Sequence, residues 1–148
     1  GFTMTATAMV IDPVGKKVTF ANASHRASYL LRRDPNSPLV IEVLQTPGTM
    51  LGTAPEATYA SQVRPFSGAD RLLLYTDGLL EAGADRGKRF GEDNLREVLS
   101  RLAETPAAAL PDEVIAEVGR HLGGRPHAAD ITVVAVGPFG NGVGARPS

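Results

Sequence analysis

Six short runs of β-forming residues precede the first helical pattern, and this order constrains the fold more than any other feature of the chain. The runs cover residues 3–11, 18–22, 27–33, 39–45, 59–66 and 72–76. Turn formers such as Asp12-Pro13 and loops rich in glycine separate them. Strands joined by short turns pair antiparallel, whereas parallel strands need long crossovers. The order therefore predicts antiparallel sheets, and the nearly uncharged first run predicts a strand covered on both faces.

The helical pattern begins only after a loop of small and charged residues, 82–91. One helix is expected from Glu92, and a second over residues 111–122, where Gly123-Gly124 ends it. The expected inward positions are Leu95, Val98, Leu99 and Leu102 in the first helix and Val114, Ile115, Val118 and Leu122 in the second. A last strand is predicted over residues 131–136. We expect one domain, residues 1–137, and a flexible tail, residues 138–148, rich in glycine and proline.

The run at residues 72–76 ends on Asp77, which Gly78 follows at once. A buried strand holds a carboxylate rigidly at its end, and hard divalent cations bind oxygen donors whose positions are fixed. Gly78 permits a sharp turn and leaves room beside the carboxylate. An Asp-Gly pair also opens ordinary turns, so the pattern alone leaves two interpretations of Asp77, a metal ligand or a turn residue.

The composition excludes several classes of function. Apolar residues make up 43% and charged residues 21% of the 148, which is typical of a single globular domain. The net charge is −1, with no basic stripe for nucleic acid and no polybasic run for a membrane surface. Cysteine is absent, which excludes disulfides, zinc–thiolate sites and cysteine nucleophiles. No apolar run approaches the ~18 residues of a membrane-spanning helix, and no signal-peptide pattern is present, so a cytoplasmic location is expected.

Several motifs occur in an order that resembles a known family. They are Asn22-Ala23-Ser24-His25, Gly68-Ala69-Asp70-Arg71-Leu72-Leu73-Leu74-Tyr75-Thr76-Asp77-Gly78, Phe90-Gly91 and Asp130-Ile131-Thr132. The order is similar to that of the SpoIIE-like, RsbU-like branch of the PPM metal-dependent protein serine/threonine phosphatases. The usual forms in that family are Asn-Ala-Gly-His, Gly-Asp-Arg-Leu leading to Tyr-Thr-Asp-Gly, Phe-Gly, and Asp-Asp-Ile-Thr. The resemblance covers nearly all of residues 3–136, and the Tyr-Thr-Asp-Gly block is its most specific part.

The resemblance implies an α+β fold, an antiparallel β-sandwich with helices packed outside, of which this chain represents the second part. It also implies two Mn²⁺ or Mg²⁺ ions, which lower the pKa of a bridging water so that hydroxide attacks phosphorus. Asp77 matches a metal ligand and catalytic residue of that set, and Gly78 matches its neighbour in the metal site. The implied partner is a phosphorylated anti-sigma-antagonist protein of the STAS class, in bacterial stress or sporulation-like signalling.

Two departures from the family pattern bear on activity. An opening metal motif of the Gly-Asp-x-x-Gly-His-Gly type has no counterpart here. The closing motif has Ala129-Asp130 where the family has two aspartates, of which the first binds metal. A methyl group cannot bind a cation, and Asp130 points to the opposite side of an extended chain unless the backbone bulges. We therefore expect weak or absent binding of Mn²⁺ or Mg²⁺, with Asp130 as a substitute ligand only through such a bulge, and little or no hydrolysis.

Other polar residues have both a functional and a structural interpretation. His25 could contact the substrate phosphate, or it could bond the backbone of its own turn. His127 could bind a metal or be solvated, and Glu81 could support the metal ligands or face solvent. The basic residues within 86–89 could meet a phosphorylated partner, although a charged loop is more often simply solvated.

The residues leave two functional hypotheses. The first is a metal-dependent phosphatase acting on phosphoserine or phosphothreonine, which Asp77 favours. The second is a catalytically dead pseudophosphatase that acts as a protein-binding regulatory module, which Ala129 favours. The second part of a sandwich would leave sheet edges unpaired and an inner face bare, so we expect either self-association through the exposed edges or an origin in a longer chain whose remainder is missing.

Overall fold

The computed structural model describes residues 1–33, 36–127 and 129–137. Its strands are β1 (Ala6–Asp12), β2 (Lys17–Ala23), β3 (Ser28–Arg32), β4 (Val40–Leu44), β5 (Gln62–Pro65), β6 (Arg71–Tyr75) and β7 (Val133–Val136). Its helices are α1 (Asp77–Glu81), α2 (Gly91–Arg101) and α3 (Leu110–Leu122), with a 3₁₀ turn, η1, at Ala84–Arg86. The tail predicted to be flexible, residues 138–148, lies outside the described residues.

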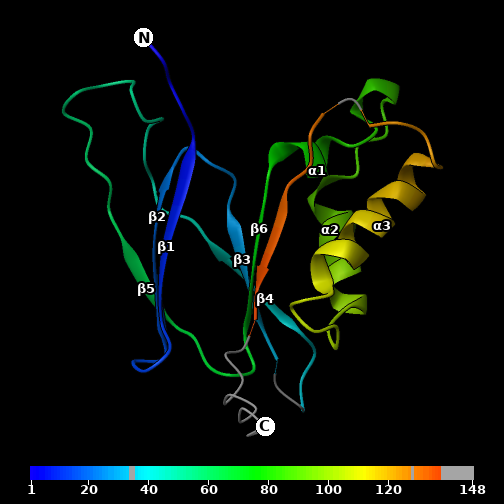
Figure 1. The fold of residues 1–148 in the computed structure, drawn as a ribbon, viewed down its shortest axis with the longest axis horizontal. Helices are drawn as coiled ribbons and strands as arrows, with labels where there is room; N and C mark the ends of the chain where they lie inside the picture. The colour runs from blue at the N-terminus through cyan, green and yellow to red at the C-terminus, as the bar shows by residue number, and fades with distance from the viewer. Residues whose placement is uncertain (34–35, 128, 138–148) are drawn as a thin grey trace, which may run out of the picture.

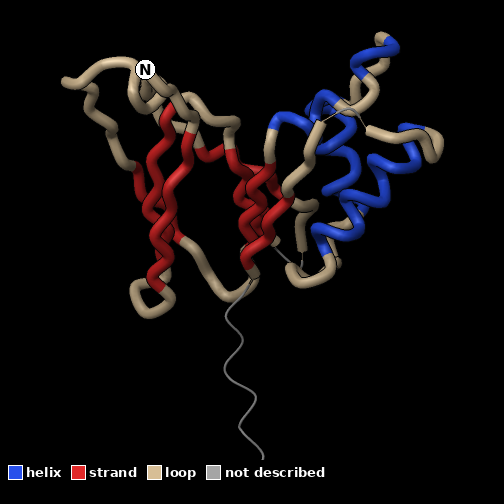
Figure 2. The backbone as a smooth tube through the Cα atoms, turned by 45° about the horizontal axis from the view of Figure 1, so that its top comes forward, coloured by secondary structure: helices blue, strands red, loops and turns tan. Residues whose placement is uncertain are grey.

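The named strands form two antiparallel sheets, as the order of the sequence predicts. One has three strands in the order β1-β2-β5, and the other has four in the order β4-β3-β6-β7. Figure 2 shows the two groups of strands facing each other across the molecule. Strand β6 has a hydrogen-bonded neighbour on each side, with Leu73 opposite both Tyr29 of β3 and Ala135 of β7. Pairing on both sides makes β6 a rigid support for a side chain at its end.

The core has two layers because residues of the four-stranded sheet alternate between its faces. Leu30 and Leu72 face the three-stranded sheet and pack with Val18 and Phe20 of β2. The residues on the other face, with Leu73 among them, pack against the helices. The prediction of a bare inner face is therefore wrong, because the inner faces of the two sheets cover each other. Self-association through the sheet edges stays a prediction.

Helices cover only one of the two sheets within the described part of the chain. Figure 1 shows α2 and α3 on the side of the four-stranded sheet that faces away from β1, β2 and β5. The outer face of the three-stranded sheet is open, and Val10 and Val63 are 69% and 51% exposed there. The expectation that the first strand is covered on both faces is therefore wrong, since only Met9 and Ile11 of β1 pack inward.

The helices differ from the prediction at two points. Helix α1, five residues long, begins at Asp77, within the Tyr-Thr-Asp-Gly block, where no helix is predicted. Ile115 of α3 is 42% exposed and not inward, whereas Val114 and Val118 are buried as predicted. Among the described residues, no helix combines the length and the apolar character needed to cross a lipid bilayer.

Candidate functional site

The end of strand β6 is fixed next to the segment that opens β7. Asp77 begins α1 two residues after β6 ends at Tyr75. The Thr76 N–H donates to the Thr132 carbonyl at 3.1 Å, and the Thr132 N–H donates to Thr76 Oγ1 at 2.9 Å. These two bonds continue the pairing of β6 with β7 by one residue. Asp77 therefore stands at the edge where the central strand and the last strand meet.

Gly78 is the point of closest approach between these two segments. A methyl group added at Gly78 would lie 2.2 Å from the main-chain oxygen of Asp130 and 3.6 Å from the Cβ atom of Ala129. Only glycine fits without a shift of the backbone. The Gly78 carbonyl accepts a hydrogen bond from His127 Nε2 at 2.7 Å, so that ring nitrogen carries the proton. His127 thus ties the segment before β7 to α1.

The Asp77 carboxylate is paired with an arginine that the sequence analysis did not single out. Arg26 Nε donates to Asp77 Oδ1 at 2.5 Å, and the two side chains are 43% and 62% exposed. This hydrogen bond is the main reason that the pKa of the Arg26 guanidinium is raised, and the nearby charges of Asp77 and Glu81 add to it. Asp77 is therefore exposed to solvent on one side and neutralised by Arg26 on the other.

The corner that carries Arg26 is organised by Asn22 rather than by His25. The buried Asn22 side chain accepts the His25 N–H at 2.9 Å and donates to Thr7 Oγ1 at 3.1 Å. The His25 ring lies with Nδ1 3.2 Å from Thr5 Oγ1. Within the described part of the chain, no hydrogen bond joins His25 to Asp77. The candidate substrate-binding residue His25 thus lies in the same corner as Arg26, with its ring turned to Thr5.

Among the described residues, this edge offers one suitable metal ligand, Asp77, which is too few for a two-metal site. Asp77 offers a carboxylate, but Ala129 offers a methyl group, and the Gly78 carbonyl is already bonded to His127. Asp130 is exposed, and its main-chain oxygen faces Gly78. Across residues 1–33, 36–127 and 129–137, no three histidine, aspartate or glutamate side chains gather closely enough to share an ion. Further carboxylates are needed to offset the dehydration of a hard cation.

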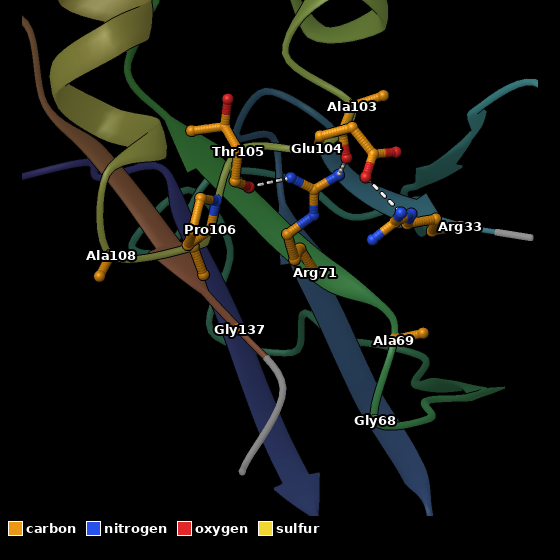
Figure 3. Close-up of a pocket in the computed structure, with 11 residues that line it drawn as sticks. Arg33, Gly68, Ala69, Arg71, Ala103, Glu104, Thr105, Pro106, Ala108 and Gly137 are labelled. Carbon is orange, nitrogen blue, oxygen red and sulfur yellow. Dashed lines mark hydrogen bonds and ion pairs between the residues drawn. The ribbon is translucent and has the colours of Figure 1, made fainter. Parts of the chain in front are cut away.

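The opposite end of the four-stranded sheet contains a cavity of about 550 Å³, and its charged groups are already paired. Figure 3 shows the Arg71 guanidinium, at the start of β6, pointing toward the carbonyls after α2. It donates to the carbonyls of Thr105 and, at 2.6 Å, of Ala103. Arg33 pairs with Glu104 at the rim. This cavity therefore offers a small ligand few free donors, and its polar groups serve to hold the loop between α2 and α3.

A family model and a curated relative each match most of this chain. The family model described as Stage II sporulation protein E (SpoIIE) matches residues 2–138. Protein IcfG of Synechocystis is 28% identical over 127 residues, which are 86% of this chain and 19% of that protein.

The fold is similar to that of solved phosphatase domains. The SiaA-PP2C domain of Pseudomonas aeruginosa matches with a TM-score of 0.73 and 22% identity, over 90% of this chain and 51% of that domain. The catalytic domain of the serine/threonine phosphatase PstP, solved in complex with two manganese ions, matches with a TM-score of 0.52 and 22% identity, over 91% of this chain and 58% of that domain. The chain therefore spans about half the length of these two domains and has their fold.

Proposed function

This chain belongs to the SpoIIE family of PPM metal-dependent protein phosphatases, and from that premise we propose that it serves the hydrolysis of phosphoserine or phosphothreonine in a bacterial signalling protein. The observation that carries the proposal is the position of Asp77, whose carboxylate stands at the end of the central strand beside the opening of β7. The proposed substrate is a phosphorylated protein of the STAS class, and the proposed cofactor is Mn²⁺ or Mg²⁺. The proposed location is cytoplasmic.

The chain's own residues suit part of this task. Asp77 provides one rigidly held oxygen ligand, and Gly78 allows the segment before β7 to approach it. Asn22 fixes the corner from which Arg26 reaches Asp77. A metal pair, when bound, supplies an activated water and neutralises the phosphate charge. In our proposal, Asp77 is the metal ligand and catalytic residue, the roles of Gly78 and Asp130 are to shape the metal site, and His25 contacts the substrate.

Three features support impaired activity in the chain as it stands. Arg26 competes with any cation for Asp77, Ala129 lacks an oxygen, and the Gly78 carbonyl is bonded to His127. A divalent ion would have to displace the charge-assisted hydrogen bond from Arg26, which is worth about 1.5–3 kcal/mol when well shielded and less at this exposed position. We therefore expect weak binding of Mn²⁺ and little or no turnover.

The pseudophosphatase hypothesis is favoured by the same ion pair, because Arg26 gives Asp77 a structural partner that does not need a metal. Hydrolysis of p-nitrophenyl phosphate in millimolar Mn²⁺ tests the impairment. The expected rate is close to that of buffer alone. A high rate that disappears in Asp77→Asn would show instead that the chain is a competent phosphatase. Mn²⁺ titration calorimetry then separates a weak metal site from none.

A further inference from the structure

The loop between α1 and α2 is a closed structure held by its own backbone. The Lys88 N–H donates to the Gly83 carbonyl at 3.1 Å, and the Phe90 N–H donates to the Ala82 carbonyl at 2.8 Å. Gly83 and Gly87 have φ values of 81° and 70°, a left-handed conformation that other residues rarely adopt. The 3₁₀ turn η1 lies between these two glycines. The basic side chains of this loop are therefore presented from a defined scaffold.

The end of helix α3 packs onto this loop. His121 Nε2 donates to the Lys88 carbonyl at 2.7 Å, and its ring meets Phe90 edge-on, with ring centres 5.4 Å apart. Gly123 ends α3 in the left-handed conformation, and the chain then continues to Arg125. The two segments are thereby joined, although they lie more than 30 residues apart in the sequence.

Between the two segments lies a cavity of about 320 Å³ lined by cationic side chains, which we call the basic pocket. Its lining includes Arg86 and Lys88 from the loop and His121 and Arg125 from the end of α3. Arg86 pairs weakly with Asp85 at 3.5 Å. For Lys88 and Arg125, no ion pair is found within the described part of the chain. Cations favour the C-terminus of a helix, but that effect does not explain Arg86 and Lys88, which belong to another element.

The basic pocket lies at the same end of the molecule as Asp77. Helix α1 separates Asp77 from the loop, and its five residues correspond to about 7.5 Å of helix. Figure 1 shows α1, the loop after it and the last turn of α3 together at the upper end. His127, two residues after Arg125, bonds the Gly78 carbonyl beside Asp77. A peptide bound in the basic pocket and extended along α1 would therefore run toward Asp77.

We propose that the basic pocket docks an acidic segment of the phosphoprotein whose phosphorylated residue reaches Asp77. The nature of this occupant rests on the proposed function. Arg86, Lys88 and Arg125 place three positive charges around the cavity, of which Asp85 partly offsets one, and this surplus of positive charge favours carboxylates. Nucleic acid is disfavoured because the chain has a net charge of −1 and no extended basic stripe along which a phosphate backbone could lie. The basic pocket thus attracts anions locally, although the chain as a whole has a slightly negative net charge.

The test is fluorescence anisotropy with a labelled oligo-aspartate peptide, in buffer of low ionic strength without metal. The double substitution Lys88→Ser with Arg125→Ser should weaken peptide binding about tenfold, because two exposed charge contacts are lost. The matched control is Lys16→Ser with Lys17→Ser, which changes the net charge equally at the turn between β1 and β2. The control should change binding by less than about twofold.

Three results would overturn the inference. They are equal weakening in both double variants, no peptide binding by the original chain at low salt, and binding of a labelled DNA duplex as tight as that of oligo-aspartate. The Asp77→Asn variant separates this inference from the proposed function. It should retain peptide binding in full, because the assay needs neither metal nor turnover. The peptide-binding result can therefore be interpreted even if the phosphatase assay fails. Loss of peptide binding in Asp77→Asn would also contradict the inference, because it would mean that the peptide binds at Asp77 and not in the basic pocket.

Discussion

The two ends of strand β6 carry opposite charges in opposite surroundings. At its start, the buried Arg71 guanidinium meets backbone carbonyls of the loop after α2, and burial lowers its pKa. Just beyond its end, the exposed Asp77 carboxylate pairs with Arg26, which is itself partly in solvent. The Arg71 charge holds the fold, whereas in our proposal the Asp77 charge is available to a metal ion. A buried, fully bonded charge indicates structure, and an exposed charge on a rigid support indicates function.

The largest expected effect is at the structural end. Arg71→Met should lower the free energy of unfolding by about 2–4 kcal/mol, because part-buried carbonyls after α2 lose their donor and a buried charge that positions them is removed. Arg33→Met is the control, since the Arg33–Glu104 pair is exposed, and its cost should stay below about 1 kcal/mol. Urea unfolding measures both values. Equal losses in the two variants would mean that Arg71 does not hold the loop.

Gly78, next to Asp77, is needed for the fold, because it lets the segment before β7 pack closely against α1. Gly78→Ala should destabilise the protein by about 1–3 kcal/mol, since the added methyl group meets the Asp130 carbonyl. Gly119→Ala in α3 has nothing within 4 Å of the new methyl group and should stabilise by about 0.5–1 kcal/mol. Urea midpoints of both variants should therefore move in opposite directions. A shift of the same sign would contradict the close approach at Gly78.

Sequence patterns predict strand β6 well, but they do not predict helix α1 after it or the open outer face of β1. Residues 72–76 read as a buried strand, and β6 occupies Arg71–Tyr75, because a short apolar run after a turn has few other solutions. Helix α1 was missed because five residues are too few to show a helical period. The open outer face of β1 was missed because a lack of charge does not reveal which neighbours a strand has.

The partner of Asp77 could not be found from the sequence. Arg26 lies 51 positions away, and its only signal is a cation directly after the Asn22–His25 corner. The position of Ala129 near Gly78 was suggested by the resemblance alone, because the pairing of β6 with β7 is a long-range contact. Local patterns thus locate the carboxylate, whereas its electrostatic surroundings depend on how distant segments come together.

The Arg26–Asp77 pair should affect metal binding more than stability. Arg26→Gln should raise Mn²⁺ affinity by about three- to tenfold, because it removes the cation that competes for the carboxylate. The free energy of unfolding should change by less than about 1 kcal/mol, since both side chains are largely exposed. Arg101→Gln breaks another arginine–carboxylate pair, with Glu117 on α3, and should leave Mn²⁺ affinity unchanged. If calorimetry shows no gain in Mn²⁺ affinity for Arg26→Gln, then Arg26 does not compete with the metal for Asp77.

The smallest expected effect lies on α3, away from both ends of β6. Hydrogen bonds from Arg120 and Arg101 lower the pKa of Glu117 to about 2. A carboxyl group whose pKa is lowered by folding stabilises the protein above its unfolded pKa, about 4.3, and this stabilisation is lost as the pH falls toward 2. Because the arginines are exposed, the contribution should be below about 1 kcal/mol. Glu117→Gln should therefore be slightly less stable than the original chain at pH 7 and equal to it near pH 2.

The central claim is that Asp77 is a metal ligand standing beside a position, Ala129, where a second carboxylate is missing. Mn²⁺ titration of Ala129→Asp tests it most directly, because this change adds one carboxylate next to Gly78 and leaves Asp77 in place. We predict at least a roughly tenfold gain in Mn²⁺ affinity over the original chain, and loss of that gain when Asp77→Asn is added. An unchanged affinity in Ala129→Asp, or a gain that survives Asp77→Asn, would contradict the account.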